Sequence, residues 1–425
     1  MSREWENRNY GNDRRFWRLV LLALLLLVIV LSVSRSLRRG VAEKPLAPVG
    51  PAPPSRSRSL PPAAPPEPSP TAAIAADGFE TLPPAAAGDA AGKADDARQG
   101  ADALFNSGDV AGALAAYRHL APTDPLSRGR AGFCLARLGR WEEAVIELRE
   151  AANLLPNDFA VRKLLTYALY RQNDLEAASA QAQAALAIQA DDGLLDLQAK
   201  LGTEIRVQRH YDDARTGNFV VLFDGYEHDE SKRMVLDILK DAYADIGKEL
   251  DYFPEQPISV ILYTAKDFSD VTSAPAWVSG LFGKFDGKIR LPVQGATGRE
   301  RELRRVLYHE YTHALLFLLA PACPLWLQEG LAQYFCGDRP VSAWQVIPLS
   351  LLARGFPAEP SAAYAAYMES LQAVSDLLEE HGMARLHQLL RKLSEGSDLE
   401  SAFATAFGQP FSHWAKNWRP AQSAE

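Results

Sequence analysis

Apolar residues follow four different patterns along the chain, and each pattern predicts a different kind of structure. An unbroken apolar run comes first, followed by a stretch rich in proline and alanine. Small apolar residues at helical spacing come next, and strand-like and helix-like runs then alternate. These patterns predict an N-terminal tail at 1–15, an anchor at 16–37, a linker at 41–93, helical repeats at 94–210 and a second folded domain at 217–420.

The apolar run predicts a single transmembrane helix. Residues 19–33 are apolar apart from Ser32, and Trp17 and Arg18, which suit the membrane interface, bring the run to the length that a layer of ~30 Å requires. A cleaved signal peptide is the alternative, but no Ala-x-Ala pattern follows the run. Five arginines precede it, against three arginines and a lysine after it, which favours a cytoplasmic N-terminus. We therefore expect a single-pass protein of the inner (cytoplasmic) membrane, with its folded domains on the extracytoplasmic (periplasmic) side.

The segment 41–93 predicts a disordered linker. Proline, alanine and serine dominate it, with proline pairs at 61–62, 65–66 and 83–84. Such a composition buries too little apolar surface to offset the entropy of the chain. We expect an extended, partly polyproline tether that holds the folded part away from the bilayer.

Charge and cysteine content narrow the range of functions. A net charge of −8 gives no reason to expect nucleic acid as a partner. The three cysteines, Cys134, Cys323 and Cys336, are too few for a disulfide framework. If the segment between Cys323 and Cys336 is helical, its length separates them by roughly 20 Å. A disulfide requires Cα atoms within about 7 Å, so we expect these two cysteines to be unbonded.

Residues 94–210 contain a repeated pattern. Gly108, Gly139 and Asn173 occupy equivalent places, 31 and 34 residues apart. In the second copy the shared positions are Ala131, Gly132, Leu135, Gly139, Trp141, Ala144, Leu148, Ala151 and Pro156. This pattern resembles the tetratricopeptide repeat, a helix-turn-helix unit of ~34 residues. We expect the Gly or Asn to end the first helix of each repeat in a left-handed turn, and residues 194–208 to form a capping helix.

The resemblance implies a concave surface that would take a protein or peptide partner. The alternative is that the three repeats pack against the next domain and serve only as a spacer. The sequence leaves both open. Cys134 falls inside a predicted helix, and we interpret it as a small core residue.

The second domain begins with strands and ends with helices, which predicts an α+β fold. Apolar runs at 218–223 and 257–263 predict strands, and 231–250 has the spacing of a helix. Residues 283–292 predict a hairpin that turns at Asp286-Gly287, and Pro292 marks where pairing stops, as at a sheet edge. A further helix is expected from near Gly298 to just before Pro321.

That further helix carries the sequence His309-Glu310-Tyr311-Thr312-His313, and Glu329 follows sixteen residues after His313. Residues four apart lie on one face of a helix, so both imidazoles can reach one Zn²⁺ ion. Glu310, beside the first histidine, can take a proton from a water on the metal. Three protein ligands leave one corner of a tetrahedral site open, which distinguishes a catalytic zinc from a structural one.

The residues from 218 to 418 resemble the gluzincin metallopeptidases, in particular the bacterial peptidase-MA-like group. The motifs that carry the resemblance are H-E-x-x-H at 309–313 and P-x-W-L-x-E-G-L-A at 324–332. The resemblance implies a zincin-like α+β domain, one zinc ion bound by His309, His313 and Glu329, and Glu310 as the general base. Gln333 stands where many gluzincins have an acidic residue that orients a ligand histidine. A glutamine can still accept a hydrogen bond from an imidazole N–H, but without a charge, so zinc affinity would be weaker unless another residue takes this role.

A zinc peptidase also needs a group that stabilises the oxyanion. In the resembled group a tyrosine lies in the region of the helix expected at 361–379, where Tyr367 aligns best and Tyr364 is the alternative. An extended peptide substrate could add to the predicted edge hairpin. Leu281, Phe282 and Phe285 would then supply apolar contacts, unless they are ordinary core residues.

Together these features predict a membrane-tethered zinc peptidase that hydrolyses a peptide or protein substrate. Two other classes compete with it. One is a binding or scaffold protein whose repeats recruit a partner and whose zinc domain is inactive. The other is a structural spacer in a membrane complex.

Overall fold

The computed structural model describes residues 93–224, 229–274, 278–292, 299–340, 347–353, 355–357 and 359–419. All of them belong to one compact unit, 61–425. The predicted tail, the predicted anchor and all but the last residue of the predicted linker lie outside the described residues. Within the described part, no helix combines the length and the apolar character that crossing a bilayer requires.

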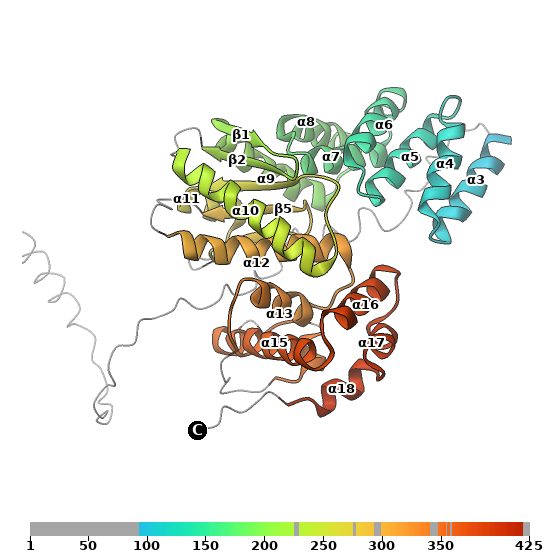
Figure 1. Ribbon diagram of the computed structural model, residues 1–425. Coiled ribbons are helices and arrows are strands. Elements are labelled where there is room, and N and C mark those ends of the chain that lie inside the picture. Colours follow the sequence, from blue (N-terminus) through green and yellow to red (C-terminus); the bar gives the residue numbers. More distant parts are fainter. Residues whose placement is uncertain are drawn as a thin grey trace, which may run out of the picture. The chain divides into compact units, whose positions relative to one another are not determined.

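The N-terminal described part consists of three helical pairs and a seventh helix (Figure 1). The pairs are α3 (Lys93–Asn106) with α4 (Val110–Leu120), α5 (Pro125–Arg137) with α6 (Trp141–Leu154), and α7 (Phe159–Arg171) with α8 (Leu175–Leu186). The seventh helix, α9 (Asp192–Gln208), packs on α8. The pairing is that of tetratricopeptide-like repeats, as the sequence pattern predicts.

Each pair turns at the residue that the repeat pattern singled out. Gly108, Gly139 and Asn173 have φ angles of 90°, 74° and 63°, in the left-handed region. An aspartate then caps the second helix in two of the pairs: Asp109 accepts from the N–H of Gly112, and Asp174 from that of Ala177. The predicted left-handed turns are confirmed.

The small residues of the repeats allow close packing between helices. A Cβ atom at Gly132 of α5 would lie 2.6 Å from Cγ of Leu148 on α6. Cys134 is fully buried in the repeat core, as predicted. Cys323 and Cys336 are also free thiols, so the prediction that they are unbonded is confirmed.

A five-stranded mixed sheet opens the second domain. Its strands are β1 (Tyr211–Arg215), β2 (Phe219–Asp224), β3 (Ile258–Tyr263), β4 (Leu281–Gly283) and β5 (Lys288–Pro292), in the order β1-β2-β3-β5-β4. The central strands β2, β3 and β5 are parallel, whereas β1 and β4 are antiparallel edges. The described pairing of β5 stops at Pro292, as expected. The sheet edge is not there, however, because β3 and β4 flank β5 and β4 forms the edge.

Helices cover both faces of the sheet. Side chains of α10 (Asp229–Leu250) and α12 (Glu300–Leu319) pack on one face with Val221, Val260 and Ile289. The other face, with Ile261 and Tyr263, meets α11 (Ala265–Thr272) and the end of α9. The last helix of the repeats is thus also a layer of the second domain.

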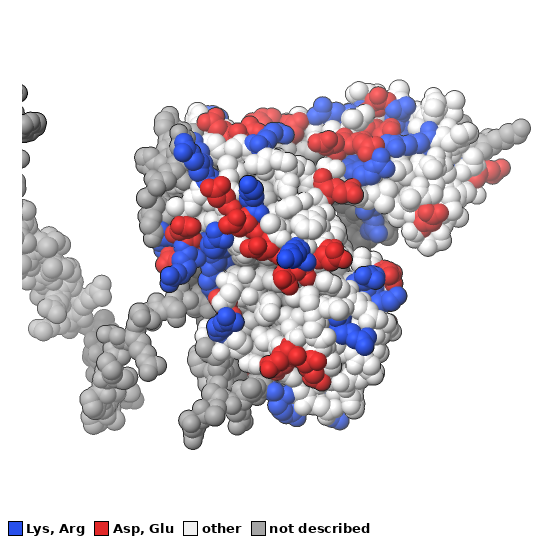
Figure 2. All heavy atoms as spheres, viewed as in Figure 1, with Lys and Arg blue, Asp and Glu red and all other residues white. Residues whose placement is uncertain are grey.

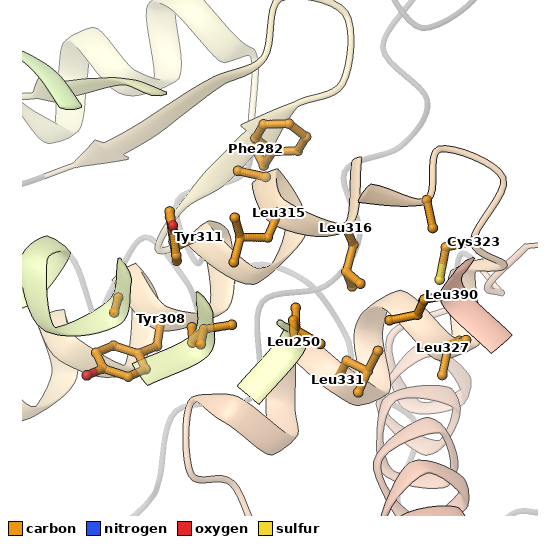
Figure 3. Packing of buried hydrophobic residues seen from close by; sticks show 14 of the residues in the cluster. Leu250, Phe282, Tyr308, Tyr311, Leu315, Leu316, Cys323, Leu327, Leu331 and Leu390 are labelled. Carbon is orange, nitrogen blue, oxygen red and sulfur yellow. The ribbon is translucent and has the colours of Figure 1, made fainter. Parts of the chain in front are cut away.

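The remaining helices form a second layer beneath α12. They are α13 (Leu325–Phe335), α14 (Leu349–Leu352), α15 (Pro360–His381), α16 (Met383–Ser394), α17 (Leu399–Phe407) and α18 (Phe411–Asn417). Figure 3 shows Leu316 of α12 and Leu327 and Leu331 of α13 in one apolar cluster. The ring of Trp326 in α13 stacks on Phe411 of α18, with centroids 5.7 Å apart. This stacking ties α13 to the end of the domain.

Charged side chains are mixed on the face of the molecule drawn in Figure 2. Acidic and basic residues alternate along α10 and over the repeats. On that face, no basic patch of the kind that tracks a nucleic-acid backbone gathers.

Candidate metal site

Helix α12 presents His309 and His313 to the same space, because four residues make slightly more than one turn. The two Nε2 atoms are 3.2 Å apart, and the rings meet edge to face with centroids 4.8 Å apart. Both side chains are largely buried, at 12% and 11% exposed. The pair is arranged for two nitrogens to face a common ligand.

Glu329 of α13 completes the group. Its Oε2 lies 3.5 Å from Nε2 of His309 and 3.4 Å from Nε2 of His313. This oxygen is buried and has no hydrogen bond of acceptable geometry. Burial alone would raise the pKa of Glu329, but the His313 charge and the polar contacts of both imidazoles hold it well below its usual value. Glu329 is therefore a buried carboxylate aimed at two imidazoles.

The three ligand atoms have the spacing of a tetrahedral zinc site. Zinc bonds of ~2.0–2.1 Å at tetrahedral angles place two ligand atoms roughly 3.3–3.4 Å apart. The three observed separations are 3.2, 3.4 and 3.5 Å. A buried oxygen without a hydrogen bond also needs a cation or donor at this point. His309, His313 and Glu329 thus fit a metal ion, and they are the group in the described part of the chain that could hold one.

Glu310 lies beside the ligands and is almost fully buried, at 4% exposed. Burial raises the pKa of Glu310 to about 7, and the charge of Glu329 adds to this, whereas His309 and a hydrogen bond from the main-chain N–H of Phe282 oppose it. A carboxylate with a pKa near neutrality can both accept and return a proton. A side chain at position 280 would collide with it, since a Cβ atom there would lie 2.9 Å from Oε1 of Glu310.

Tyr367 of α15 also faces this group. Its side chain is buried, and burial raises its pKa well above the usual value, with further contributions from the charges of Glu329 and Glu310. Tyr367 therefore lies within electrostatic reach of both glutamates and keeps its proton. Tyr364, one turn earlier on α15, is half-buried.

Gly330 and Gln333 join α13 to α15. A Cβ atom at Gly330 would collide with the main-chain carbonyl of Ser370, so glycine is needed for this close approach. The Gln333 amide donates to the carbonyl oxygens of Glu329, at 3.2 Å, and Tyr367, at 2.9 Å. Gln333 does not accept a hydrogen bond from a ligand histidine, because its buried Oε1 has no hydrogen-bond partner among the described residues. Gln333 instead fixes the distance between the helices of Glu329 and Tyr367.

The three apolar residues that the sequence offered as substrate contacts all take part in packing. Phe282 lies against Phe317 of α12, with ring centroids 5.6 Å apart. Phe285 lies against Tyr167 and Tyr170 of the repeats. Leu281 is half-buried and packs against the cluster that contains Ile261 and Tyr263. The alternative interpretation, ordinary packing, therefore applies to all three.

Sequence reasoning missed two contributors to the site. The first is the main chain at Gly280 and Phe282, which lies close to Glu310. A glycine beside a predicted strand could have indicated this close approach, because glycine allows another group to come near the backbone. The second is the ion pair of Arg305, one turn before His309, with Asp338, just past the end of α13. It is bidentate, with both N···O distances at 2.6 Å. This pair ties together the two helices that carry the metal ligands.

Comparison with known proteins assigns the second domain. Residues 239–423 match the model of the Peptidase MA superfamily, a match that begins within α10 and includes α12 and α13. No match was found among curated proteins. One solved structure that matches is the yeast Sti1 TPR2AB-domain:pHSP90 complex, at 11% identity and a TM-score of 0.25, covering 71% of this chain and 98% of that one. A TM-score this low carries no argument. Residues 239–423 are thus a Peptidase MA superfamily domain, and tetratricopeptide-like helical repeats precede it.

Proposed function

We propose that this chain is a membrane-tethered, zinc-dependent peptidase that hydrolyses peptide bonds. The observation that carries the proposal is the triangle of His309, His313 and Glu329, with edges of 3.2 to 3.5 Å, next to the buried carboxylate of Glu310. One zinc ion per chain would be held by these three residues. When bound, zinc supplies Lewis acidity, which makes water a nucleophile near neutral pH and polarises a peptide carbonyl.

Glu310 is the proposed general base. Its carboxylate accepts a proton from the attacking water and delivers that proton to the nitrogen of the departing amine. A pKa near neutrality supports both transfers, because the acid and its conjugate base are then similar in free energy.

Tyr367 is the proposed donor to the oxyanion. Its phenol stays protonated because burial and two nearby carboxylates raise its pKa. A phenolic O–H held near the metal can donate a hydrogen bond to negative charge that develops on the substrate oxygen.

The substrate is proposed to be an extended peptide that lies along strand β4. β4 is an edge strand, and among the described strands it pairs with β5 alone. Gly280, just before β4, lies against Glu310, so the strand begins beside the proposed base. Main-chain pairing with such an edge binds a peptide regardless of most of its side chains.

The proposed location rests on the sequence. The apolar run at 16–37 would anchor the chain in the inner membrane, and the linker at 41–93 would hold the peptidase on the extracytoplasmic side. A reporter fused after Glu425 tests the side of the membrane.

One pair of variants tests the peptidase. Glu310→Gln should keep one zinc per chain and lose cleavage of a peptide library, because the amide cannot accept the proton. His309→Ala should lose both zinc and cleavage. Undiminished cleavage by Glu310→Gln would refute the role of this residue.

A binding or scaffold protein with an inactive zinc domain is the second candidate. The observation that favours it is Gln333, which bonds to main-chain oxygens and leaves the ligand histidines without an acidic partner from that position. Zinc binding by a wild-type chain that cleaves nothing across a broad peptide library would support this candidate.

A further inference from the structure

The β4–β5 hairpin joins the repeats to the candidate active site. Its two strands pair in register, with Phe282 opposite Ile289 and Gly283 opposite Lys288. The turn at 284–287 and strand β5 contact the repeats, whereas Gly280, just before β4, contacts Glu310. The hairpin therefore has contacts with the repeats on one side and with Glu310 on the other.

At the turn, Phe285 enters the inner face of the third repeat. Its ring meets Tyr167 edge to face, with centroids 5.4 Å apart, and lies 5.6 Å from the ring of Tyr170. The guanidinium of Arg171 donates to the main-chain oxygen of Phe285 at 3.0 Å. This guanidinium also lies over the ring of Phe317, on the helix that carries the two histidines. The last repeat therefore holds both the turn and the end of α12.

Strand β5 adds buried polar contacts to the same repeat. Lys288 donates to Oδ1 of Asn173 at 2.7 Å, and its ammonium lies 4.5 Å from the centre of the Tyr170 ring. The Arg290 guanidinium pairs with Glu204 of α9 at 3.1 Å. It also pairs with Asp286 in the turn.

The ion pairs of Arg290 are buried, so they hold β5 strongly to α9 and to the turn. The side chains of Arg290, Glu204 and Asp286 are at most 2% exposed. Removing Arg290 would leave Glu204 and Asp286 as buried charges without this partner, which is strongly destabilising. The hairpin is thus held to the repeats at its turn and along β5.

At the other side of the hairpin, the main chain just before β4 touches the proposed base. The N–H of Phe282 lies near enough to Glu310 to lower its pKa. A Cβ atom at Gly280 would lie 2.9 Å from both Cγ and Oε1 of Glu310, so the main chain runs directly against this side chain. A shift of β4 would therefore move or release Glu310.

We propose that the repeats position Glu310 through the β4–β5 hairpin. The third repeat then helps to position a residue of the candidate active site, and Phe285 of the hairpin is the main positioning residue. The surface of the third repeat at Tyr167 and Tyr170 is occupied by this hairpin. The catalytic consequence rests on the proposed role of Glu310 as general base. The mechanical coupling does not depend on that role.

Truncation of Phe285 in the full chain tests the coupling. Phe285→Ala should lower kcat at least ~10-fold, with zinc per chain unchanged and KM within about twofold, because a small misplacement of a catalytic group is costly. Phe285→Leu, which retains apolar bulk, should restore most of kcat. Phe253→Ala is the matched control, since it truncates a half-exposed phenylalanine of the same domain away from the hairpin.

Hydrogen exchange at the amides of residues 280–283 gives a readout that needs no activity. Phe285→Ala should speed exchange there at least ~10-fold relative to wild type, and Phe253→Ala should not. Asn173→Gly, which removes the acceptor of Lys288 and still suits the left-handed turn, should act in the same direction and serves if Phe285→Ala does not fold. Exchange and kcat equal to those of the control would overturn the proposal. A wild-type chain that cleaves nothing would refute the peptidase, and exchange alone would then decide the coupling.

Discussion

Gly280 lies directly against Glu310, because a Cβ atom at Gly280 would be 2.9 Å from both Cγ and Oε1 of that side chain. Gly280 immediately precedes the edge strand β4, so this contact brings the sheet against the helix of the two histidines. The N–H of Phe282 in β4 also lowers the pKa of Glu310. The position of this carboxylate is thus set by the sheet as well as by its own helix.

Substitution of Gly280 tests the contact between the main chain and Glu310. The new methyl of Gly280→Ala would lie 2.9 Å from Oε1 of Glu310 and 2.7 Å from Cγ1 of Val306. We expect kcat to fall ~10–100-fold at unchanged zinc content, and the free energy of unfolding to fall by about 1–3 kcal/mol. Steady-state kinetics and urea unfolding measure both.

Gly202→Ala is the control for that substitution. Gly202 lies in helix α9 with nothing within 4 Å of a Cβ atom, so alanine should stabilise the chain by roughly 0.5–1 kcal/mol and leave kcat unchanged. Equal kcat in the two variants would show that the main chain at Gly280 does not constrain Glu310.

The Arg305–Asp338 pair should influence zinc affinity although neither residue is a proposed ligand. Asp338→Asn removes the bidentate link between the ends of α12 and α13. We expect zinc affinity to weaken about 10-fold, because the ligands are then less well oriented. The exposed pair Arg299–Glu302 on the same helix is the control, and Glu302→Gln should leave affinity unchanged. Competition with a zinc chelator measures both, and equal affinities would contradict the expectation.

Much of the fold was predictable because it follows from local rules. Gly108, Gly139 and Asn173 adopt the left-handed turns that their spacing predicted. The helix of His309 and His313 begins and ends within two residues of the expected bounds. Local spacing also indicated the histidine pair, since residues four apart must share a helix face.

The unpredicted features depend on contacts between distant segments. Pro292 lies in an interior strand because β3, and not solvent, pairs with β5. Phe285 packs on the repeats, more than a hundred residues earlier in the chain, so no local pattern distinguishes it from a substrate contact. Gln333 bonds to main-chain oxygens, and only the approach of α15 brings one of these oxygens near.

The buried ammonium of Lys288 predicts a pH dependence of stability. Burial lowers the pKa of Lys288 to about 8 from an ordinary 10.5, although Asp286 and Glu204 act in the opposite direction. Between these two values the unfolded chain binds a proton that the folded chain does not, so this residue makes stability rise with pH across that window. Lys288→Met should remove that rise.

Unfolding measured at pH 8 and pH 10 tests this assignment. Other groups titrate in the same range, so the quantity of interest is the difference in slope between wild type and Lys288→Met. Lys266→Met, at an exposed ion pair, should keep the wild-type slope. A wild-type slope in Lys288→Met would show that this lysine keeps its charge in the folded chain.

Metal analysis of the purified chain is the direct test of whether His309, His313 and Glu329 hold one zinc ion. We expect about one zinc per chain in wild type and in Glu310→Gln, and loss of the metal in His309→Ala and Glu329→Ala. A wild-type chain that takes up no zinc, or a Glu329→Ala variant that binds it as tightly as wild type, would show that these residues are not the zinc site.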